Sequence, residues 1–342
     1  VSASRRRVWL VRLLKLDVAV LLLVVAWVLS QAVPSSEAVR LRNALVLDGT
    51  VSAAGAEWSP LQAPSDFRFE QRKPSQFFQR LADRPEFKLE GSWIRAQALG
   101  RSLQVKLEDR GPIMKGLEES YTRIVERGEG YCGDFADVFT AMAHASGIAT
   151  RQWSFSFDGY GGNGHIFNEV WDDKANKWRA LDIFNNYVFL DPESGEALSA
   201  LEFRASLRGE RPMARIVQFN PAARVGFVIP EKAVAYYRKG MDQWYLWWGN
   251  HVFTTDADPA VDMLGRISRH AGQLAAIAEG VQPRMRIVET PASSAEIARM
   301  LELKERLLLA GKLAAGLLIV ALAIGIALKL HPSKGGRAFH GR

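Results

Sequence analysis

The 342-residue chain is 48% hydrophobic and 24% charged, with 28 Gly and 14 Pro, and this composition excludes a disordered, collagen-like or low-complexity protein. The formal charge of +7 would fit an anionic partner, but residues 1–17 hold five basic residues and one acid, and residues 329–342 hold four basic residues. The region between these tails is close to neutral, so we expect no nucleic-acid partner.

The basic N-terminal tail is followed by an apolar run over residues 18–33, which the preceding leucines extend to a length that can cross a bilayer. We interpret residues 1–33 as a cytoplasmic tail and a transmembrane helix. Because the small residues Ser30 and Ala32 also fit a cleavage site, a removed signal peptide is the alternative. Either interpretation exports the segment that follows.

A second apolar run covers residues 313–328 without a charge, and it predicts a transmembrane helix over residues 307–330 in which Lys312 snorkels. A buried core helix is the alternative. Residues 331–342 form a second basic tail. The positive-inside rule places both tails in the cytoplasm. The sequence therefore predicts a protein of the inner membrane, in contact with lipid, whose main domain is periplasmic or extracellular.

The first exported segment, residues 34–110, is polar and rich in Ala, Ser and Pro, and we interpret it as a linker and irregular lead-in structure. A helix over residues 76–83 is its clearest element. We assign the next segment, residues 111–229, to the central domain.

Clear periodic patterns begin at Gly111. Apolar residues at helical spacing predict a helix that starts at Pro112 and is closed by Gly128, and a second helix that starts at Cys132 and is ended by Gly147. Alternation predicts three strands, over residues 150–157, 165–171 and 178–183. Helices followed by an antiparallel meander indicate an α+β fold.

Residues 230–306 are expected to be helical, with helices over residues 231–248 and 262–279. Ser293 and Glu296 form a capping-box pattern at the start of a helix that continues into the second membrane span. Residues 236–248 are unusually rich in Trp and Tyr. They fit a core helix, a membrane-interface belt or a platform for a sugar or a lipid-linked substrate, and the sequence does not separate these roles.

Cys132 is the only cysteine, so it cannot form an internal disulfide in an exported domain. A thiol attacks a carbonyl carbon as the thiolate, which a helix N-terminus or an imidazole stabilises. Cys132 lies at a predicted helix N-terminus, and Gly133 leaves one side of the sulfur open. The backbone N–H of Cys132 is the one donor of an oxyanion hole that we assign, and the side-chain donor of that hole is not assigned.

His165 and Asp182 are the partners that we expect for this thiol. His165 enters a strand directly after a glycine-rich loop, and Asp182 ends the next strand, so a short turn between the strands brings the two residues to one end of a hairpin. An imidazole would act as the base, and a carboxylate would orient it. The competing interpretations are a packed core thiol, a structural histidine and a turn or salt-bridge carboxylate.

The segments GEGYCGDFADVF, GHIFNEVW and KWRALDIF resemble the Cys, His and Asp motifs of the transglutaminase-like superfamily, which shares its core with papain-like cysteine proteases. The resemblance covers about residues 111–191. It implies helices packed on an antiparallel sheet, with Cys132 as nucleophile, His165 as general base and then acid, and Asp182 as orienting acid. It further implies a thioester passed to an amine or to water.

Two other motifs are rejected. Gly159, Gly161 and Gly164 satisfy the dinucleotide-binding spacing, but a strand and not a helix is expected at the third glycine. The histidines show no helical metal-binding pair, so no metal and no other cofactor is expected.

These observations favour a membrane-anchored, exported cysteine enzyme that transfers or hydrolyses acyl groups of an envelope peptide, protein or glycopolymer. A peptidase would share this chemistry and differ only in the acceptor. The alternative is a non-catalytic subunit of a membrane assembly, such as one for polysaccharide export, whose partners are other envelope proteins.

Overall fold

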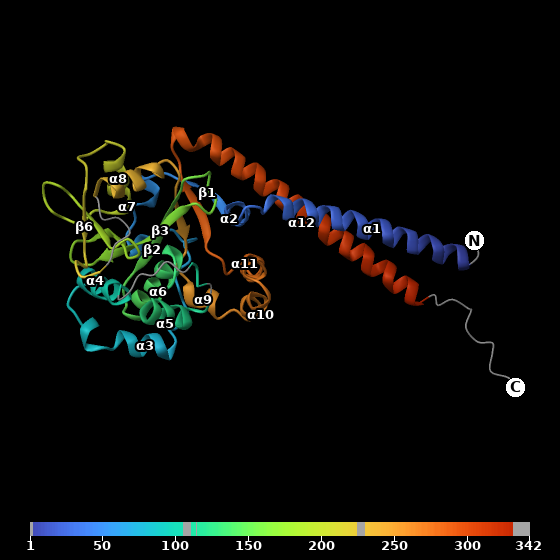
Figure 1. Ribbon diagram of the computed structural model, residues 1–342, viewed down its shortest axis with the longest axis horizontal. Coiled ribbons are helices and arrows are strands. Elements are labelled where there is room, and N and C mark those ends of the chain that lie inside the picture. The colour runs from blue at the N-terminus through green and yellow to red at the C-terminus, as the bar shows by residue number, and fades with distance from the viewer. Residues whose placement is uncertain (1–2, 105–110, 114, 224–229, 331–342) are drawn as a thin grey trace.

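The computed structural model describes residues 3–104, 111–113, 115–223 and 230–330, and an eight-stranded sheet lies at the centre of the folded part (Figure 1). The strands follow the order β1-β8-β7-β2-β3-β4-β5-β6. Every neighbouring pair is antiparallel except β1 with β8, which is parallel. The strands are β1 Leu47–Val51, β2 Thr150–Ser156, β3 Gly164–Asp172, β4 Lys177–Asp182, β5 Tyr187–Leu190, β6 Arg215–Gln218, β7 Trp244–Trp248 and β8 Arg284–Val288.

The described residues also form α-helices along the whole chain, so the predicted α+β fold is confirmed. The helices are α1 Ala3–Gln31, α2 Ser35–Val46, α3 Gln76–Ala82, α4 Ser92–Leu103, α5 Leu117–Arg127, α6 Cys132–Ala145, α7 Ala200–Leu207, α8 Pro230–Lys239, α9 Val252–Asp256, α10 Pro259–Ile267, α11 Arg269–Ala278 and α12 Ser294–Leu330.

The two faces of the sheet are covered by different helices, because alternate residues of each strand point to opposite faces. In β3, Phe167 packs in the core that includes residues of α7 and α8, whereas Val170 packs in the core formed by α3, α4, α5 and α6. A third cluster joins α2 and α12 to β7 and β8. The sheet is therefore buried on both faces, and α6, which begins at Cys132, lies directly on it.

The predicted meander over residues 150–183 is confirmed as β2, β3 and β4. The chain reverses between β3 and β4 at a turn that contains Asn176, and between β4 and β5 at a turn that contains Asn186, both with positive φ. Asparagine tolerates this backbone region better than most residues do. The α5–α6 pair also matches the prediction, since Gly128 and Gly147 have positive φ and close the two helices.

The helix predicted over residues 231–248 is wrong. Helix α8 ends at Lys239, and the aromatic run that follows is strand β7 between β2 and β8. Gly240 causes the break: a Cβ at this position would lie 2.3 Å from Cδ2 of Phe155, so the chain turns against the Phe155 ring. All five residues of β7 are buried, which explains an aromatic run without alternation of polar and apolar residues.

Other predicted boundaries also shift. The helix expected from Pro112 begins at Leu117, and the helix expected over residues 262–279 is two helices joined at Ser268, which caps α11. The capping box lies one turn earlier than predicted, between Thr290 and Ser293.

The segments that we expected to be separate regions contribute strands to one sheet. Residues 34–110 supply β1, together with helices that include α2 and α4, and residues 230–306 supply β7 and β8. The sheet therefore crosses the boundaries expected near residues 110 and 230.

Two long helices extend side by side from one side of the domain (Figure 1). Residues 5–31 of α1, and residues 291–330 around α12, are both long and apolar enough to cross a membrane, and very little of either apolar window is buried. As predicted, α12 continues without a break from Ser294; its 37 residues span about 55 Å at 1.5 Å per residue. The predicted tail over residues 331–342 lies outside the described residues.

Candidate active site

Cys132 is the first residue of α6, and the residues around it fix the start of this helix. Gly130 has φ +110°, and a Cβ there would crowd both Ile113 and Asp134, so only glycine fits the approach to the helix. The Asp134 carboxylate accepts hydrogen bonds from the backbone N–H groups of Tyr131, at 2.8 Å, and Ile113, at 3.1 Å. The Cys132 side chain is half-buried and not in a disulfide.

This position gives the thiol two advantages. The N–H of a first helical residue has no acceptor within its own helix, so the Cys132 N–H is a potential donor to an oxyanion. The sulfur also lies at the positive end of the helix dipole, which stabilises a thiolate.

His165 and Asp182 meet across the β3–β4 ladder. Because Asn168 pairs with Leu181, Asp182 lies opposite Phe167, and His165 is its diagonal neighbour on the same face of the sheet. The Nε2 atom of His165 lies 2.5 Å from Oδ2 of Asp182, and both side chains are buried. The predicted hairpin geometry therefore holds for this pair.

The Asp182 carboxylate is held by two residues that sequence reasoning missed. Asn185 donates its backbone N–H to Oδ1 and its side-chain amide to Oδ2, both at 3.0 Å. The Tyr237 hydroxyl also donates to Oδ2. Asp182 is fully buried, so these donors replace the water that a carboxylate would otherwise bind.

The imidazole of His165 interacts with both Asp182 and Cys132. Asp182 and Asn185 lie at its Nε2 atom, and the Cys132 side chain also acts on the ring. Burial alone would lower the pKa of His165, but the charge and hydrogen bond of Asp182, together with Cys132, outweigh it and raise the pKa to about 10. The ring therefore carries its proton at neutral pH.

Aromatic rings enclose this imidazole. Their centroids lie 5.6 to 6.3 Å from that of His165, and they belong to Phe155, Phe167, Phe184, Tyr236 and Tyr237. The ring is thereby oriented and kept from bulk water. Burial, and then the charges of Cys132 and Asp182, raise the pKa of Tyr236, so its hydroxyl stays neutral.

The aromatic residues of the segment 236–248 have two different locations. Tyr236 and Tyr237 of α8 contact the site, whereas Trp244 of β7 stacks on Phe155 within the sheet core, with ring centroids 5.7 Å apart.

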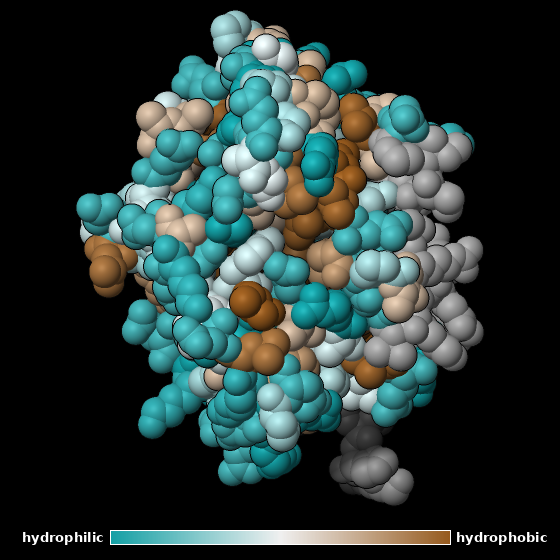
Figure 2. All heavy atoms as spheres, turned by 90° about the vertical axis from the view of Figure 1, so that its left-hand side faces the viewer, coloured by the Kyte–Doolittle hydropathy of each residue, from teal (hydrophilic) through white to brown (hydrophobic). Residues whose placement is uncertain are grey.

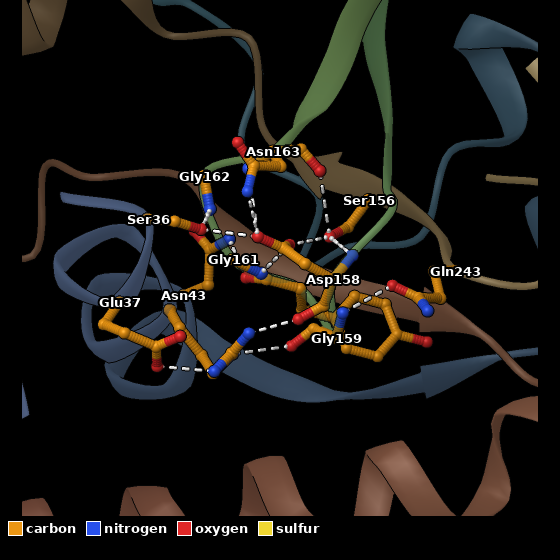
Figure 3. Close-up of polar contacts among 12 residues, drawn as sticks. Ser36, Glu37, Asn43, Ser156, Asp158, Gly159, Gly161, Gly162, Asn163 and Gln243 are labelled. Atoms are coloured by element: carbon orange, nitrogen blue, oxygen red, sulfur yellow. Dashed lines mark hydrogen bonds and ion pairs between the residues drawn. The ribbon is translucent and has the colours of Figure 1, made fainter. Parts of the chain in front are cut away.

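The glycine-rich loop that precedes His165 is tied to α2 (Figure 3). The Asp158 carboxylate accepts hydrogen bonds from Ser36 of α2, at 2.5 Å, and from Ser156, at 2.8 Å. Arg40 of α2 donates to the carbonyl oxygens of Asp158 and Gly159, and Asn43 donates to that of Tyr160, at 2.8 Å. We call these contacts of Ser36, Arg40 and Asn43 with residues 158–160 the loop clamp.

The loop clamp holds residues that lead into β3. Gly164 is the first residue of β3, and a Cβ there would lie 2.2 Å from the carbonyl oxygen of Phe155, so this position requires glycine. His165 follows directly. Because a strand and not a helix starts at Gly164, the loop lacks the helix N-terminus that a dinucleotide phosphate would need, as the sequence predicted.

Two of the surface cavities formed by the described residues are not lined by Cys132, His165 or Asp182. One, of about 480 Å³, lies between α4 and α5, and the other, of about 370 Å³, lies between the loop clamp and α12.

Comparison with known proteins gives one family match. Residues 101–183 match the family model described as the transglutaminase-like superfamily, and this range contains all three candidate residues. Asn185 and Tyr237 lie beyond it. No curated protein and no solved structure matches the chain. Residues 101–183 of this chain thus form a transglutaminase-like superfamily domain.

Proposed function

We propose that this protein is a membrane-anchored, exported cysteine enzyme that transfers or hydrolyses acyl groups through a thioester on Cys132. The observation that carries the proposal is the hydrogen-bonded pair of His165 and Asp182, whose imidazole also interacts with the Cys132 side chain at the N-terminus of a helix. A merely structural cysteine would not need a buried imidazole whose charge is stabilised by a buried carboxylate.

In the first half-reaction the Cys132 thiolate attacks the carbonyl carbon of an amide, and a C–S bond forms. The oxygen becomes an oxyanion, which the Cys132 N–H at the helix N-terminus can stabilise. His165 then donates its proton to the leaving nitrogen, the C–N bond breaks, and the amine departs. Cys132 is left as a thioester, and His165 is neutral.

In the second half-reaction neutral His165 acts as the base. It removes a proton from an incoming amine or from water, which attacks the thioester carbon. The C–S bond breaks, and the product leaves as a new amide or as a carboxylic acid. The thiolate and the protonated imidazole are restored, with Asp182 stabilising the cation throughout.

The proposed location follows from the two long helices and their basic flanks. If α1 and α12 both cross the membrane, the positive-inside rule places both tails in the cytoplasm and the domain on the outer side. The substrates available there are envelope peptides, proteins and glycopolymers, and we propose one of these as the acyl donor. Other envelope or polysaccharide-assembly proteins are the proposed partners.

Alkylation of Cys132 tests the proposal. Since the chain has one cysteine, the intact mass after brief treatment with iodoacetamide reports this thiol alone. We expect the full-length protein to be labelled at least tenfold faster than its His165→Ala variant at about neutral pH. His144→Ala is the matched control, because His144 packs on Phe253 and lies outside the site, and it should keep the wild-type rate.

Equal labelling of wild type and His165→Ala would contradict the proposal and favour the non-catalytic subunit. That alternative further predicts stable co-purification with other membrane proteins and no thioester with any acyl donor.

A further inference from the structure

Helices α10 and α11 form a hairpin that exposes large apolar side chains. Met263, Ile267 and Leu274 are 60%, 77% and 58% exposed, respectively, and we call these three residues the hairpin face. Met263 and Ile267 are four residues apart and share one side of α10. An amphipathic helix normally buries such a side against its own protein, and in α10 no residue is buried.

The exposure does not result from loose packing between the two helices. A Cβ on Gly272 of α11 would lie 2.9 Å from Cα of Gly265 of α10, so the two backbones are in close contact. Both helix starts are capped: Asp258 accepts from the N–H groups of Ala260 and Val261, and Ser268 accepts from that of Ala271. The hairpin is thus a well-formed unit, and its apolar face points away from its own contacts.

The hairpin lies on the side of the domain from which α1 and α12 extend (Figure 1). Helix α11 packs against α2, which begins only four residues after α1 ends. On the opposite face of the molecule, hydrophilic side chains surround a few apolar patches (Figure 2). The hairpin therefore lies on the same side of the domain as the two long helices.

We propose that the hairpin face docks on the lipid bilayer into which α1 and α12 insert, with Met263, Ile267 and Leu274 at the boundary between headgroups and acyl chains. The inference rests on the membrane anchorage in the proposed function. Arg266 lies between two of these residues in sequence; it is exposed, and its ion pair with Asp262 raises its pKa, so its charge persists at the level of the lipid phosphates.

Such docking would give the domain a third attachment to the membrane. Two adjacent helices alone leave the helix pair free to tilt in the bilayer together with the domain. A third contact through α11 and α2 would hold the loop clamp, and through it the start of β3 at His165, in one orientation relative to the lipid surface.

Lipid quenching of a site-attached fluorophore tests the docking. Cys132→Ala removes the only cysteine, and Met263→Cys, Ile267→Cys or Leu274→Cys then gives one labelling site in the full-length chain. The labelled protein is reconstituted in vesicles of phosphatidylethanolamine and phosphatidylglycerol, with or without lipids that carry a doxyl quencher near the headgroup. Leu22→Cys and Leu318→Cys report the two spans. Ile94→Cys, which is 50% exposed, is the control, and it belongs to α4, a helix far from the two long helices in Figure 1.

We expect the quencher to reduce the emission from all three hairpin positions to about half, and that from Ile94→Cys not at all. Quenching at Leu22→Cys and Leu318→Cys with none at the hairpin would overturn the docking and leave the membrane anchorage intact. An absence of quenching at the two span positions as well would overturn both proposals. The comparison includes only those single-cysteine variants whose circular dichroism spectrum matches that of the wild type.

Discussion

The substitution Asp182→Asn removes the charge that His165 depends on while keeping the size of the side chain. In the wild type, Asp182 and Cys132 raise the pKa of His165 from 6.5 to about 10, although burial alone would lower it. A shift of this size corresponds to a preference for the charged ring on the order of 5 kcal/mol. Without the carboxylate, burial lowers the pKa of His165 and only Cys132 still raises it, so we expect the neutral ring to be favoured.

A neutral ring can no longer hold the proton of the thiol, so the thiolate population at neutral pH should fall. We expect alkylation of Cys132 at about pH 7 to be at least tenfold slower in Asp182→Asn, with recovery of the rate as the pH is raised toward 9. Asp173→Asn, an exposed side chain in the β3–β4 turn, is the control. A labelling rate in Asp182→Asn that follows the wild-type pH profile would refute the reasoning.

The raised pKa of His165 also makes the unfolding free energy depend on pH. Because the pKa of His165 is higher in the folded protein, the His165–Asp182 pair contributes its full stabilisation below about pH 6.5, and this contribution is lost as the pH rises through about 10. The difference in unfolding free energy between wild type and Asp182→Asn, measured by denaturant unfolding, should therefore shrink at alkaline pH. A difference that stays constant over this range would contradict the assignment of the pKa to this pair.

Three further substitutions test the site and its support. Cys132→Ala should abolish any acyl transfer but change the melting temperature little; retained activity would exclude Cys132 as the nucleophile. Asp158→Ala removes acceptors of the loop clamp and should lower the unfolding free energy by about 2 kcal/mol and slow the alkylation of Cys132, whereas Asp173→Ala should do neither. Gly164→Ala should cost about 3 kcal/mol or more, because the added Cβ would overlap the Phe155 carbonyl oxygen, and Gly195→Ala, which meets nothing within 4 Å, about 1 kcal/mol for its positive φ. Equal losses in the two glycine variants, measured by denaturant unfolding, would refute the steric explanation.

The central part of the site could be predicted because its residues stand in short segments with strong local patterns. Cys132 begins a helix with clear start and stop residues, and His165 and Asp182 lie on two strands joined by a short turn. In such a hairpin the register follows from the local sequence, so the meeting of the two side chains could be expected.

The supporting residues could not be found in this way. Tyr237 reaches Asp182 from a helix 55 residues further along the chain, and no pattern in the sequence indicates that contact. Asn185 follows Asp182 by three residues, and an Asp with a nearby Asn donor is the one local signal that could have identified it.

The errors in the fold have similar causes. Residues 244–248 are apolar on both faces because β7 is an inner strand, and such a run shows no strand alternation. Strand β1 pairs with β8, which lies more than 200 residues away, so its neighbouring sequence carried no hint of a partner. Because residues 34–110 are mostly polar, neither α2 nor β1 was predicted in that segment.

The covalent state of Cys132 after exposure to an acyl donor tests most directly whether this thiol is the nucleophile. The full-length protein is treated briefly with an activated acyl ester, and its intact mass is measured before and after hydroxylamine, which cleaves thioesters. We predict one acyl group per chain, which hydroxylamine removes. The acyl group should be absent in Cys132→Ala and strongly reduced in His165→Ala, but His144→Ala should carry it as the wild type does. An unmodified Cys132, or equal acylation in the His165 and His144 variants, would contradict this prediction.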